Sequence, residues 1–181
     1  MLAKARFSER LTVTDTNENG SAAATPATGN ETGQTAQAQP SVRILGQYLK
    51  DLSFENPQAP QALAPQQSQP DIAISVNVNA RNLGNTDFEV ELHLDAKATQ
   101  QDKVVFAAEL VYAGTFRLEN FPQQMLHPAV LIECPRLLFP FARQILAEAT
   151  RNGGFPPLML DPIDFASMYQ RRMQQETVGR A

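Results

Sequence analysis

The sequence predicts an α+β domain in which a run of strands is followed by helices. Three observations lead to this prediction: apolar side chains alternate with polar ones from Asp71 to Leu118, their spacing becomes helical after Asn120, and the composition changes near Pro40. Alternation is the period of a β-strand, whereas a spacing of three and four residues is that of an amphipathic helix. Strands first and helices last are typical of the α+β class.

A compositional boundary near Pro40 divides the 181 residues into an extension and one domain of ordinary size. From Thr12 to Pro40 the chain is mostly Thr, Ala, Asn, Gly and Gln, which cannot bury enough apolar surface to offset the entropy of ordering. We therefore expect residues 1–40 to be a disordered N-terminal extension, residues 41–175 to be the folded domain and residues 176–181 to be a flexible tail.

Apolar residues return from Ser41 and lead into a Pro-rich link, 57–70, which should be extended and irregular. Three strands follow. The first alternates Ile and Val with polar residues up to a turn at 82–85, and the second has one wet, acidic face and closes in a hairpin at 99–102. The third, Val104 to Leu118, is largely apolar on both faces. Such a strand is either the centre of a monomeric core or covered on its second face by another subunit.

Helical spacing begins after Asn120. A short piece is predicted around Pro128, followed by a longer apolar stripe from Leu137 to Ala149 that stops at 152–154. Asp161 is a natural N-cap for a last helix, because Pro162 suits the first helical position.

Composition argues against several classes of function. The chain has 15 Lys and Arg against 19 Asp and Glu, a net charge of -4 and no basic cluster, so nucleic acid is not an expected partner. No window approaches the apolar length of a membrane span, so direct membrane insertion is not expected either. The single Cys134 cannot form an internal disulfide, and His93 and His127 lie far apart. We expect no metal and no cofactor, and a reducing cytoplasmic location.

Catalysis is the minority interpretation. No Ser, Cys or Lys sits in a nucleophile signature, the glycines do not form a phosphate loop, and neither histidine has an obvious orienting partner. Cys134 beside Pro135 is expected to be a buried small hydrophobe, and His93 is expected to be solvated on the polar face of a strand. The prediction is therefore that the protein is not an enzyme.

Three blocks of the sequence carry a family resemblance. They are Lys50-Asp-Leu-Ser-Phe-Glu-Asn-Pro57, Cys134-Pro-Arg-Leu-Leu-Phe-Pro-Phe-Ala-Arg143 and Gly154-Phe-Pro-Pro-Leu-Met-Leu-Asp-Pro-Ile-Asp-Phe165, in this order and separated by strands of suitable length. From about Val42 to Gln175 the chain resembles the SecB-type protein-export chaperones. The resemblance implies a four-stranded antiparallel sheet with two main helices packed on one face, assembled as a homotetramer that is a dimer of dimers.

The function implied by the resemblance is that of an ATP-independent cytosolic holdase. Such a chaperone binds unfolded secretory precursor proteins and delivers them to the SecA translocation motor, using exposed apolar grooves that accept extended segments. One alternative stays open: a chaperone of the same fold that serves another system, for example an antitoxin-linked holdase without SecA contact. An enzyme with a ligand in the same groove is a distant third.

The resemblance also assigns residues to surfaces. The client-binding groove of the family is matched by Ile72, Ile74, Val76, Tyr169 and Met173. The surface that meets the zinc-binding C-terminal tail of SecA is matched by Asp51, Glu55, Ala107 and Glu109. The positions that govern association of dimers into the tetramer are matched by Phe106, Ala108, Leu110 and Tyr112.

The sequence departs from the family pattern at three places. Ala107 is smaller than the bulky apolar residue usual in the docking surface, and Tyr112 replaces a smaller polar residue. The N-terminal extension is longer than the family norm, and residues 1–10 fit an upstream extension read from an earlier start codon.

Overall fold

The computed structural model describes residues 39–64 and 69–178. The predicted N-terminal extension therefore lies almost wholly outside the described residues, as do the last residues of the predicted C-terminal tail. The first strand begins at Ser41, where the composition of the sequence changes.

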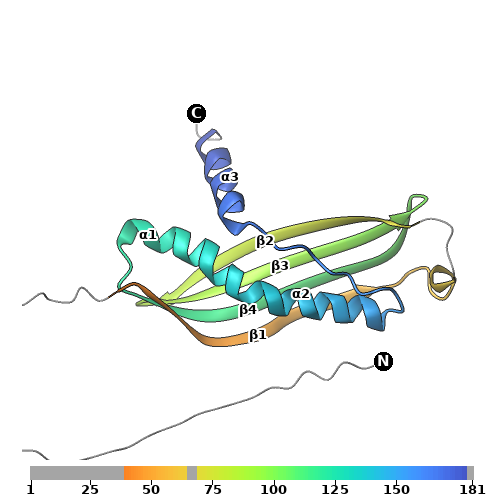
Figure 1. Ribbon diagram of the computed structural model, residues 1–181, viewed down its shortest axis with the longest axis horizontal. Helices are drawn as coiled ribbons and strands as arrows, with labels where there is room; N and C mark the ends of the chain where they lie inside the picture. The colour runs from red at the N-terminus through yellow and green to blue at the C-terminus, as the bar shows by residue number, and fades with distance from the viewer. Residues whose placement is uncertain (1–38, 65–68, 179–181) are drawn as a thin grey trace, which may run out of the picture. The chain divides into compact units, whose positions relative to one another are not determined.

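Four antiparallel strands form a single sheet, as predicted (Figure 1). They are β1 (Ser41–Glu55), β2 (Asp71–Gly84), β3 (Asp87–Gln100) and β4 (Lys103–Glu119). Their order is β1-β4-β3-β2, so β1 and β2 are the two edges and the segment between them crosses from one edge to the other. That crossover includes a short 3-10 helix, η1 (Gln61–Leu63).

The two hairpin turns fall where the sequence predicts them. At the first, Gly84 and Asn85 have φ angles of 119° and 51°. At the second, Gln101 and Asp102 have φ angles of 49° and 62°. Gln101 and Asp102 are the two central residues of the second turn, and positive φ at both makes the turn that matches the twist of antiparallel strands. At the first turn the positive φ angles belong to Gly84, which ends β2 after a register shift, and to Asn85, because Gly and Asn adopt positive φ at little cost.

One long helical rod crosses a single face of the sheet (Figure 1). It consists of α1 (Gln123–Pro128), a π-helical turn η2 (Ala129–Glu133) and α2 (Cys134–Asn152). Prolines lie on both sides of the π-helical turn, at Pro128 and Pro135, and each lacks the amide N–H that an α-helical hydrogen bond requires. The rod ends at Gly153 and Gly154, which confirms the predicted stop.

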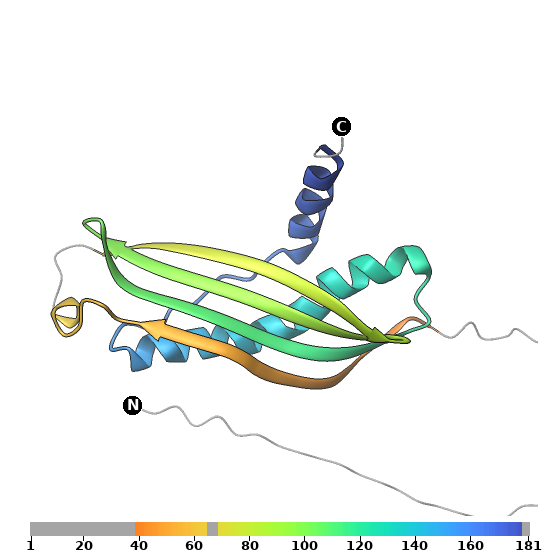
Figure 2. The ribbon, with the colours of Figure 1, turned by 180° about the vertical axis from the view of Figure 1, so that it is seen from behind.

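The last helix, α3 (Phe165–Val178), differs from the prediction in three ways. Its N-terminus is capped by Asp164, whose carboxylate accepts hydrogen bonds from the Ser167 amide at 3.0 Å and the Ser167 hydroxyl at 2.7 Å, so the predicted cap at Asp161 is wrong. The helix continues beyond residue 175. It also projects away from the sheet, so of the two helices predicted to pack on one face only α2 lies across it (Figure 2).

The main core lies between the sheet and α2. Alternate residues of β3 and β4 supply the sheet side, and α2 supplies Leu138, Ala142 and Leu146, which are fully buried. In Figure 2 the sheet lies in front of α2, and no described helix covers its near face, which we call the open face.

The four residues predicted to mediate assembly lie on the helix side of the sheet. Phe106, Ala108, Leu110 and Tyr112 are 4%, 1%, 0% and 8% exposed, because they point from β4 toward the helix side of the sheet. Within one chain their side chains are already covered, and their role in assembly stays a prediction. β4 is thus a central strand whose helix side belongs to the monomeric core, one of the two interpretations that its apolar pattern allowed.

Candidate binding surfaces

A groove of about 500 Å³ separates β2 from α3. Its sheet wall includes Ile74 and Val76, and its helix wall includes Met168 and Tyr169. Ile74 is 44% exposed although Val78, further along the same face of β2, is buried, because α3 stands away from the sheet at Ile74. The groove is therefore an apolar trough that one chain leaves open.

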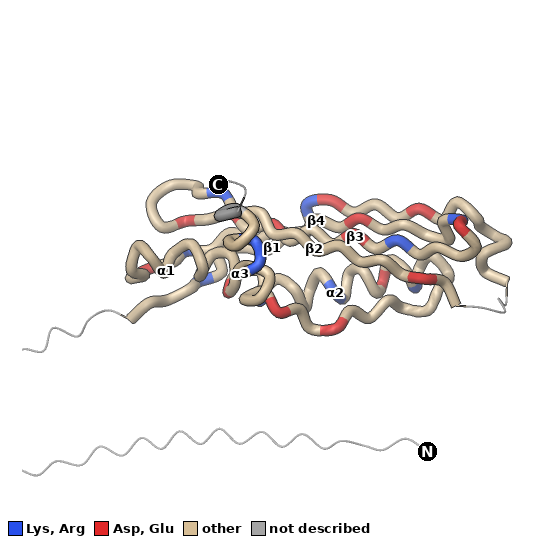
Figure 3. The backbone as a smooth tube through the Cα atoms, turned by 90° about the horizontal axis from the view of Figure 1, so that it is seen from above, with Lys and Arg blue, Asp and Glu red and all other residues tan. Residues whose placement is uncertain are grey.

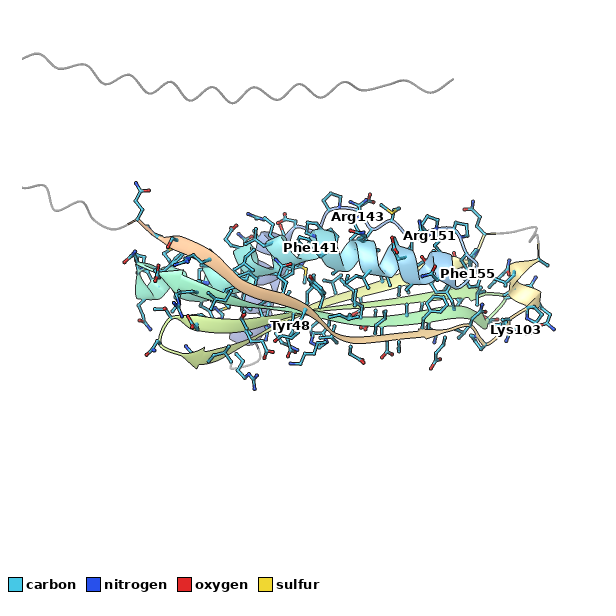
Figure 4. The ribbon with its side chains drawn as sticks, turned by 90° about the horizontal axis from the view of Figure 1, so that it is seen from below. Tyr48, Lys103, Phe141, Arg143, Arg151 and Phe155 are labelled. Carbon is cyan, nitrogen blue, oxygen red and sulfur yellow. The ribbon has the colours of Figure 1, made fainter. Side chains whose placement is uncertain are left out.

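A second hollow, of about 520 Å³, lies at the other end of β2 beneath the crossover. Ile72 lines it together with Leu63, Val105, Phe106 and Phe155. Phe106 and Phe155 pack with their ring centroids 5.0 Å apart, and Phe54 lies 5.8 Å from Phe106. Figure 4 shows Phe155 on the helix side of the sheet. Because aromatic rings offer large apolar surfaces, this hollow suits bulky apolar side chains.

Both hollows lie along the same edge strand. Residues Ile72 to Val78 connect them over roughly 20 Å at the rise of an extended strand. At Val78 the amide donates to the side chain of Asn77 at 2.9 Å, and the carbonyl accepts from Arg172 of α3 at 3.2 Å. Its backbone groups therefore point away from β3, and those of Ile72, Ile74 and Val76 point the same way because alternate residues of a strand are equivalent. This edge is available for pairing with an extended chain.

The structure places four of the five predicted groove residues in these two hollows. Ile74, Val76 and Tyr169 line the trough, and Ile72 lines the aromatic hollow. Met173 is 38% exposed on α3 but is not among the residues that line either hollow. The Tyr169 hydroxyl also lies 3.0 Å from the His127 ring, so α3 is tied to α1 as well as facing β2.

Sequence reasoning missed the aromatic hollow. Phe54, Phe106 and Phe155 come from three distant segments, and only the fold brings their rings together. The glycine at position 153 was a sequence signal of close packing here, because a Cβ atom at that position would lie 2.3 Å from the Phe54 ring. That close approach shows why the helix ends in glycine where the aromatic ring packs.

The four residues predicted to dock SecA lie together on the open face. In the strand pairing, Glu55 of β1 is opposite Ala107 of β4, and Ser53 is opposite Glu109. Asp51 is opposite Val111, one residue pair further along the same face. Since directly opposed side chains are about 5 Å apart, the three carboxylates fall within one contiguous area. All three acidic residues are exposed.

A bulge in β1 brings Asp51 to this face. The β1–β4 register shifts between Leu49 and Asp51, so Lys50 has no partner on β4. Without the shift Lys50 would stand opposite Val111 and Asp51 would turn toward the helices. With it, Lys50 and Asp51 follow one another on the open face, which is how bulges redirect side chains.

A further carboxylate, Asp95, belongs to the same area. It lies directly opposite Glu109 in the pairing of β3 with β4 and is exposed. Lys97, opposite Ala107, is the cation of β3 nearest to this area in the register. We call Asp51, Glu55, Asp95 and Glu109 the acidic patch, and Figure 3 shows acidic residues recurring along these strands. The alternating Asp and Glu residues of β3 could have indicated Asp95 as part of this surface, but from the sequence they were interpreted only as a solvent-exposed face.

Next to the acidic patch, the open face carries a charge-balanced network. The carboxylate of Glu89 accepts hydrogen bonds from the Tyr48 hydroxyl at 2.5 Å, from Lys50 at 3.2 Å and from Arg81 at 2.8 Å. Lys50 also bonds Glu91. Glu89 is only 5% exposed, so this part of the predicted wet face is in fact buried beneath its own partners.

Hydrogen bonding sets the ionisation of this network. The Tyr48 hydroxyl, and then Lys50, lower the pKa of Glu89 from its ordinary value, although burial works in the opposite sense. Lys50 first, then His93, lower the pKa of Glu91 in the same way. The hydrogen bond to Glu91 is the largest of the interactions that raise the pKa of Lys50. All three groups are therefore held in their charged forms near neutral pH.

The predicted non-catalytic residues can be placed as well. Cys134 is fully buried, as expected, and burial, with the nearby Glu133, raises the pKa of its thiol to about 12. His93 is not simply solvated, because its ring lies 3.1 Å from Glu91 and 3.2 Å from Asn79. In residues 39–64 and 69–178, no group of three or more His, Cys, Asp or Glu side chains is arranged to hold a metal ion. Among the helices of these residues, none is long and apolar enough to cross a membrane.

Comparison with known proteins gives a consistent result. Residues 35–176 match the family model described as Preprotein translocase subunit SecB. The Protein-export protein SecB of Afipia carboxidovorans is 64% identical over 141 residues, which cover 78% of this chain and 88% of that protein. The protein of the same name from Xanthobacter autotrophicus is 61% identical over 144 residues, which cover 80% and 92%.

A solved structure supports the fold. It is a SecB-like chaperone of Mycobacterium tuberculosis in complex with a peptide from an antitoxin, with a TM-score of 0.52 and 19% identity over 67% of this chain and 90% of that chain.

An open apolar trough beside a strand edge that no other described strand pairs, with a separate acidic face, is typical of a protein that binds extended polypeptide rather than a small substrate. The chain belongs to the SecB family of protein-export chaperones. This is a chaperone family and not an enzyme family, and the resemblance seen in the sequence is confirmed.

Proposed function

We propose that the chain is an ATP-independent holdase of the cytoplasm that binds unfolded secretory precursors and passes them to SecA. The observation that carries this proposal is the pair of apolar hollows joined by the open edge of β2. An unfolded chain offers backbone donors and acceptors everywhere and large apolar side chains at irregular intervals. A strand edge satisfies the backbone groups without regard to sequence, and the hollows accept the side chains.

The residues of the groove support broad selectivity. Met168 and Tyr169 form its helix wall, and methionine adapts its shape while tyrosine is amphipathic. Pairing along the edge extends up to Val78, where Asn77 and Arg172 already occupy the outward backbone groups. A bound segment is therefore limited to the stretch of β2 between the crossover and this point.

The acidic patch supports docking to a basic partner, and we assign it to the zinc-binding C-terminal tail of SecA. Asp95 faces Glu109 across two strands, and like charges in that position repel one another. A basic segment that lies over them relieves this repulsion, which favours binding and its rate at low salt. Because the patch lies on the open face and the groove on the other side, the two ligands do not compete for one surface.

Assembly as a dimer of dimers is supported by exposed apolar residues on two further surfaces. The edge strand β1 exposes Leu45, Leu49 and Leu52 by 47%, 48% and 40%, and α2 exposes Leu137 and Phe141 by 40% and 48%. A long apolar edge strand promotes aggregation unless another chain covers it. Pairing of β1 with a second copy, and of α2 with another pair, covers both surfaces.

Tyr112 can affect this assembly although it is buried. Its ring stacks on that of Phe141 with centroids 6.2 Å apart, and Phe141 is itself half exposed on α2. Figure 4 shows Phe141 on the helix side of the sheet and Tyr48 on the other side. The residues of β4 predicted to govern the tetramer would then act by setting the position of α2.

One experiment tests the precursor-binding function directly. A reduced, unfolded precursor is diluted from urea with and without the chain, without ATP, and aggregation is followed by light scattering. Suppression at a stoichiometric ratio supports the holdase, and undiminished aggregation contradicts it. Asp51→Arg should leave suppression intact while weakening binding of the SecA tail.

A second candidate is a chaperone of this fold that serves an antitoxin. It is favoured by one finding, that the solved structure of similar fold holds an antitoxin peptide. The export chaperones are far more similar in sequence, at 64% and 61% identity, and favour the first function. Tight binding of an antitoxin segment without measurable SecA binding would reverse this preference.

A further inference from the structure

The bulge in β1 creates a problem of charge. It places Lys50 immediately before Asp51 on the open face, so the backbone of Lys50 lies next to the acidic patch. An ammonium on a flexible four-carbon stem pairs readily with neighbouring carboxylates. If Lys50 paired with Asp51, the patch would lose part of the negative charge that a basic partner requires.

The structure places the Lys50 side chain elsewhere. It crosses β4 to reach β3, where its Nζ bonds Glu91 and lies 3.2 Å from Glu89. Ala113 of β4 lies between the strands at this point, opposite both Tyr48 and Glu91 in the register. Because its side chain is only a methyl group, the long Lys50 and Tyr48 side chains can pass over it, and Ala113 is fully buried beneath them.

The network is built for this arrangement. Glu89 is held by Tyr48 and Arg81 as well as by Lys50, so its carboxylate keeps its position without the lysine. Its side chain is 7% exposed, whereas that of Lys50 is 41% exposed. The two glutamates balance Lys50 and Arg81, and the charges of the acidic patch remain unbalanced by the network.

We propose that Glu89 and Glu91 are positioning residues that hold Lys50 away from Asp51 and so keep the acidic patch open to a basic segment. Neither glutamate belongs to the patch or touches the partner. The role rests on the proposed docking of a basic segment at the patch. It assigns a function to a buried polar network that neither the client groove nor the docking carboxylates explain.

A double-mutant cycle tests this role. One arm is Glu89→Gln with Glu91→Gln, which keeps hydrogen-bonding oxygens but removes the charges that hold Lys50. The other arm is Lys50→Met, which keeps the length of the stem. The probes are octalysine and, separately, the SecA C-terminal tail, with affinities measured by calorimetry at low salt.

The Gln/Gln variant should bind octalysine about tenfold more weakly than the wild type. Adding Lys50→Met to the Gln/Gln variant should recover most of the lost affinity for octalysine. The factor by which Lys50→Met tightens binding should be several-fold larger in the Gln/Gln background than in the wild type. If only the total charge of the face matters, Lys50→Met changes affinity by the same factor in both backgrounds. That result overturns the proposal, as does a wild-type chain that fails to bind octalysine.

Arg81→Met provides the matched control in the Gln/Gln background. It removes one positive charge from the same network, but Arg81 lies on β2, at the opposite edge of the sheet from Asp51. Recovery by Arg81→Met equal to that by Lys50→Met contradicts the positioning role. A chain that shows the predicted coupling with octalysine but does not bind the SecA tail overturns the docking partner and leaves the role of the glutamates in place.

Discussion

Truncation of Ile72 and Ile74 together should weaken the binding of unfolded precursors strongly. In the free chain the two residues are 43% and 44% exposed, so together they offer a client nearly the apolar surface of one complete isoleucine side chain. Burial of one such side chain contributes about 2 kcal/mol. The variant Ile72→Ala/Ile74→Ala should therefore bind an unfolded precursor roughly thirtyfold more weakly.

The assay is fluorescence anisotropy of a labelled, reduced precursor, combined with urea titration to show that the variant is folded. Ser75→Ala is the matched control, because Ser75 lies on the same strand but faces the other side of the sheet. The control should bind like the wild type, and binding of the SecA tail should be unchanged in both variants. A folded double variant with wild-type affinity for the precursor would refute the assignment of β2 as the client surface.

Four further predictions concern other parts of the molecule. Glu109→Lys should weaken SecA-tail binding at least tenfold in calorimetry with no effect on precursor binding, whereas Asp161→Lys, outside the patch, should change neither. The pKa of Glu89 is lowered in the folded chain, so the ionised carboxylate stabilises the fold above its ordinary pKa of about 4.3, and this stabilisation is lost as pH falls through the pKa of the folded chain. Urea titrations from about pH 6 to pH 3 should therefore show a smaller fall in the free energy of unfolding for Glu89→Gln than for the wild type. Gly153→Ala should lower the free energy of unfolding by about 1–3 kcal/mol, because the added methyl group would meet an aromatic ring at 2.3 Å. Leu49→Arg should reduce the assembled mass in light scattering toward that of fewer subunits while the far-UV spectrum stays unchanged, since it charges the exposed edge of β1.

Local patterns predicted β2, β3 and β4, the turns and the main helix because each is coded within a short window, whereas the fourth strand, β1, was expected only from the family resemblance. Alternation over β3 and β4 gave the faces correctly, and the turns at Gly84 and Asp102 contain residues that accept positive φ. The last helix was harder, because both Asp161 and Asp164 precede it and both can cap. Only the three-dimensional path shows that Pro162 and Ile163 remain outside the helix.

Surfaces that depend on pairing between distant segments were less accessible. The position of Asp51 on the open face requires a bulge at Lys50 that no local pattern indicates. The aromatic hollow requires Phe54, Phe106 and Phe155 to meet, and the family resemblance had assigned Phe106 only to assembly. Glu89 is buried because Tyr48 and Lys50 reach it across Ala113, a single small residue. The alternation of β3 by itself predicts only that Glu89 lies on a solvent-exposed face.

We propose that one sheet serves two partners from opposite sides, clients at β2 with α3 and SecA at the acidic patch. The direct test is to titrate the SecA tail into the chain already saturated with an unfolded precursor, with the two ligands carrying different fluorophores. We expect a ternary complex in which the tail binds with nearly the affinity that it has for the free chain and releases no precursor. Displacement of the precursor by the tail, in proportion to the tail bound, would contradict it.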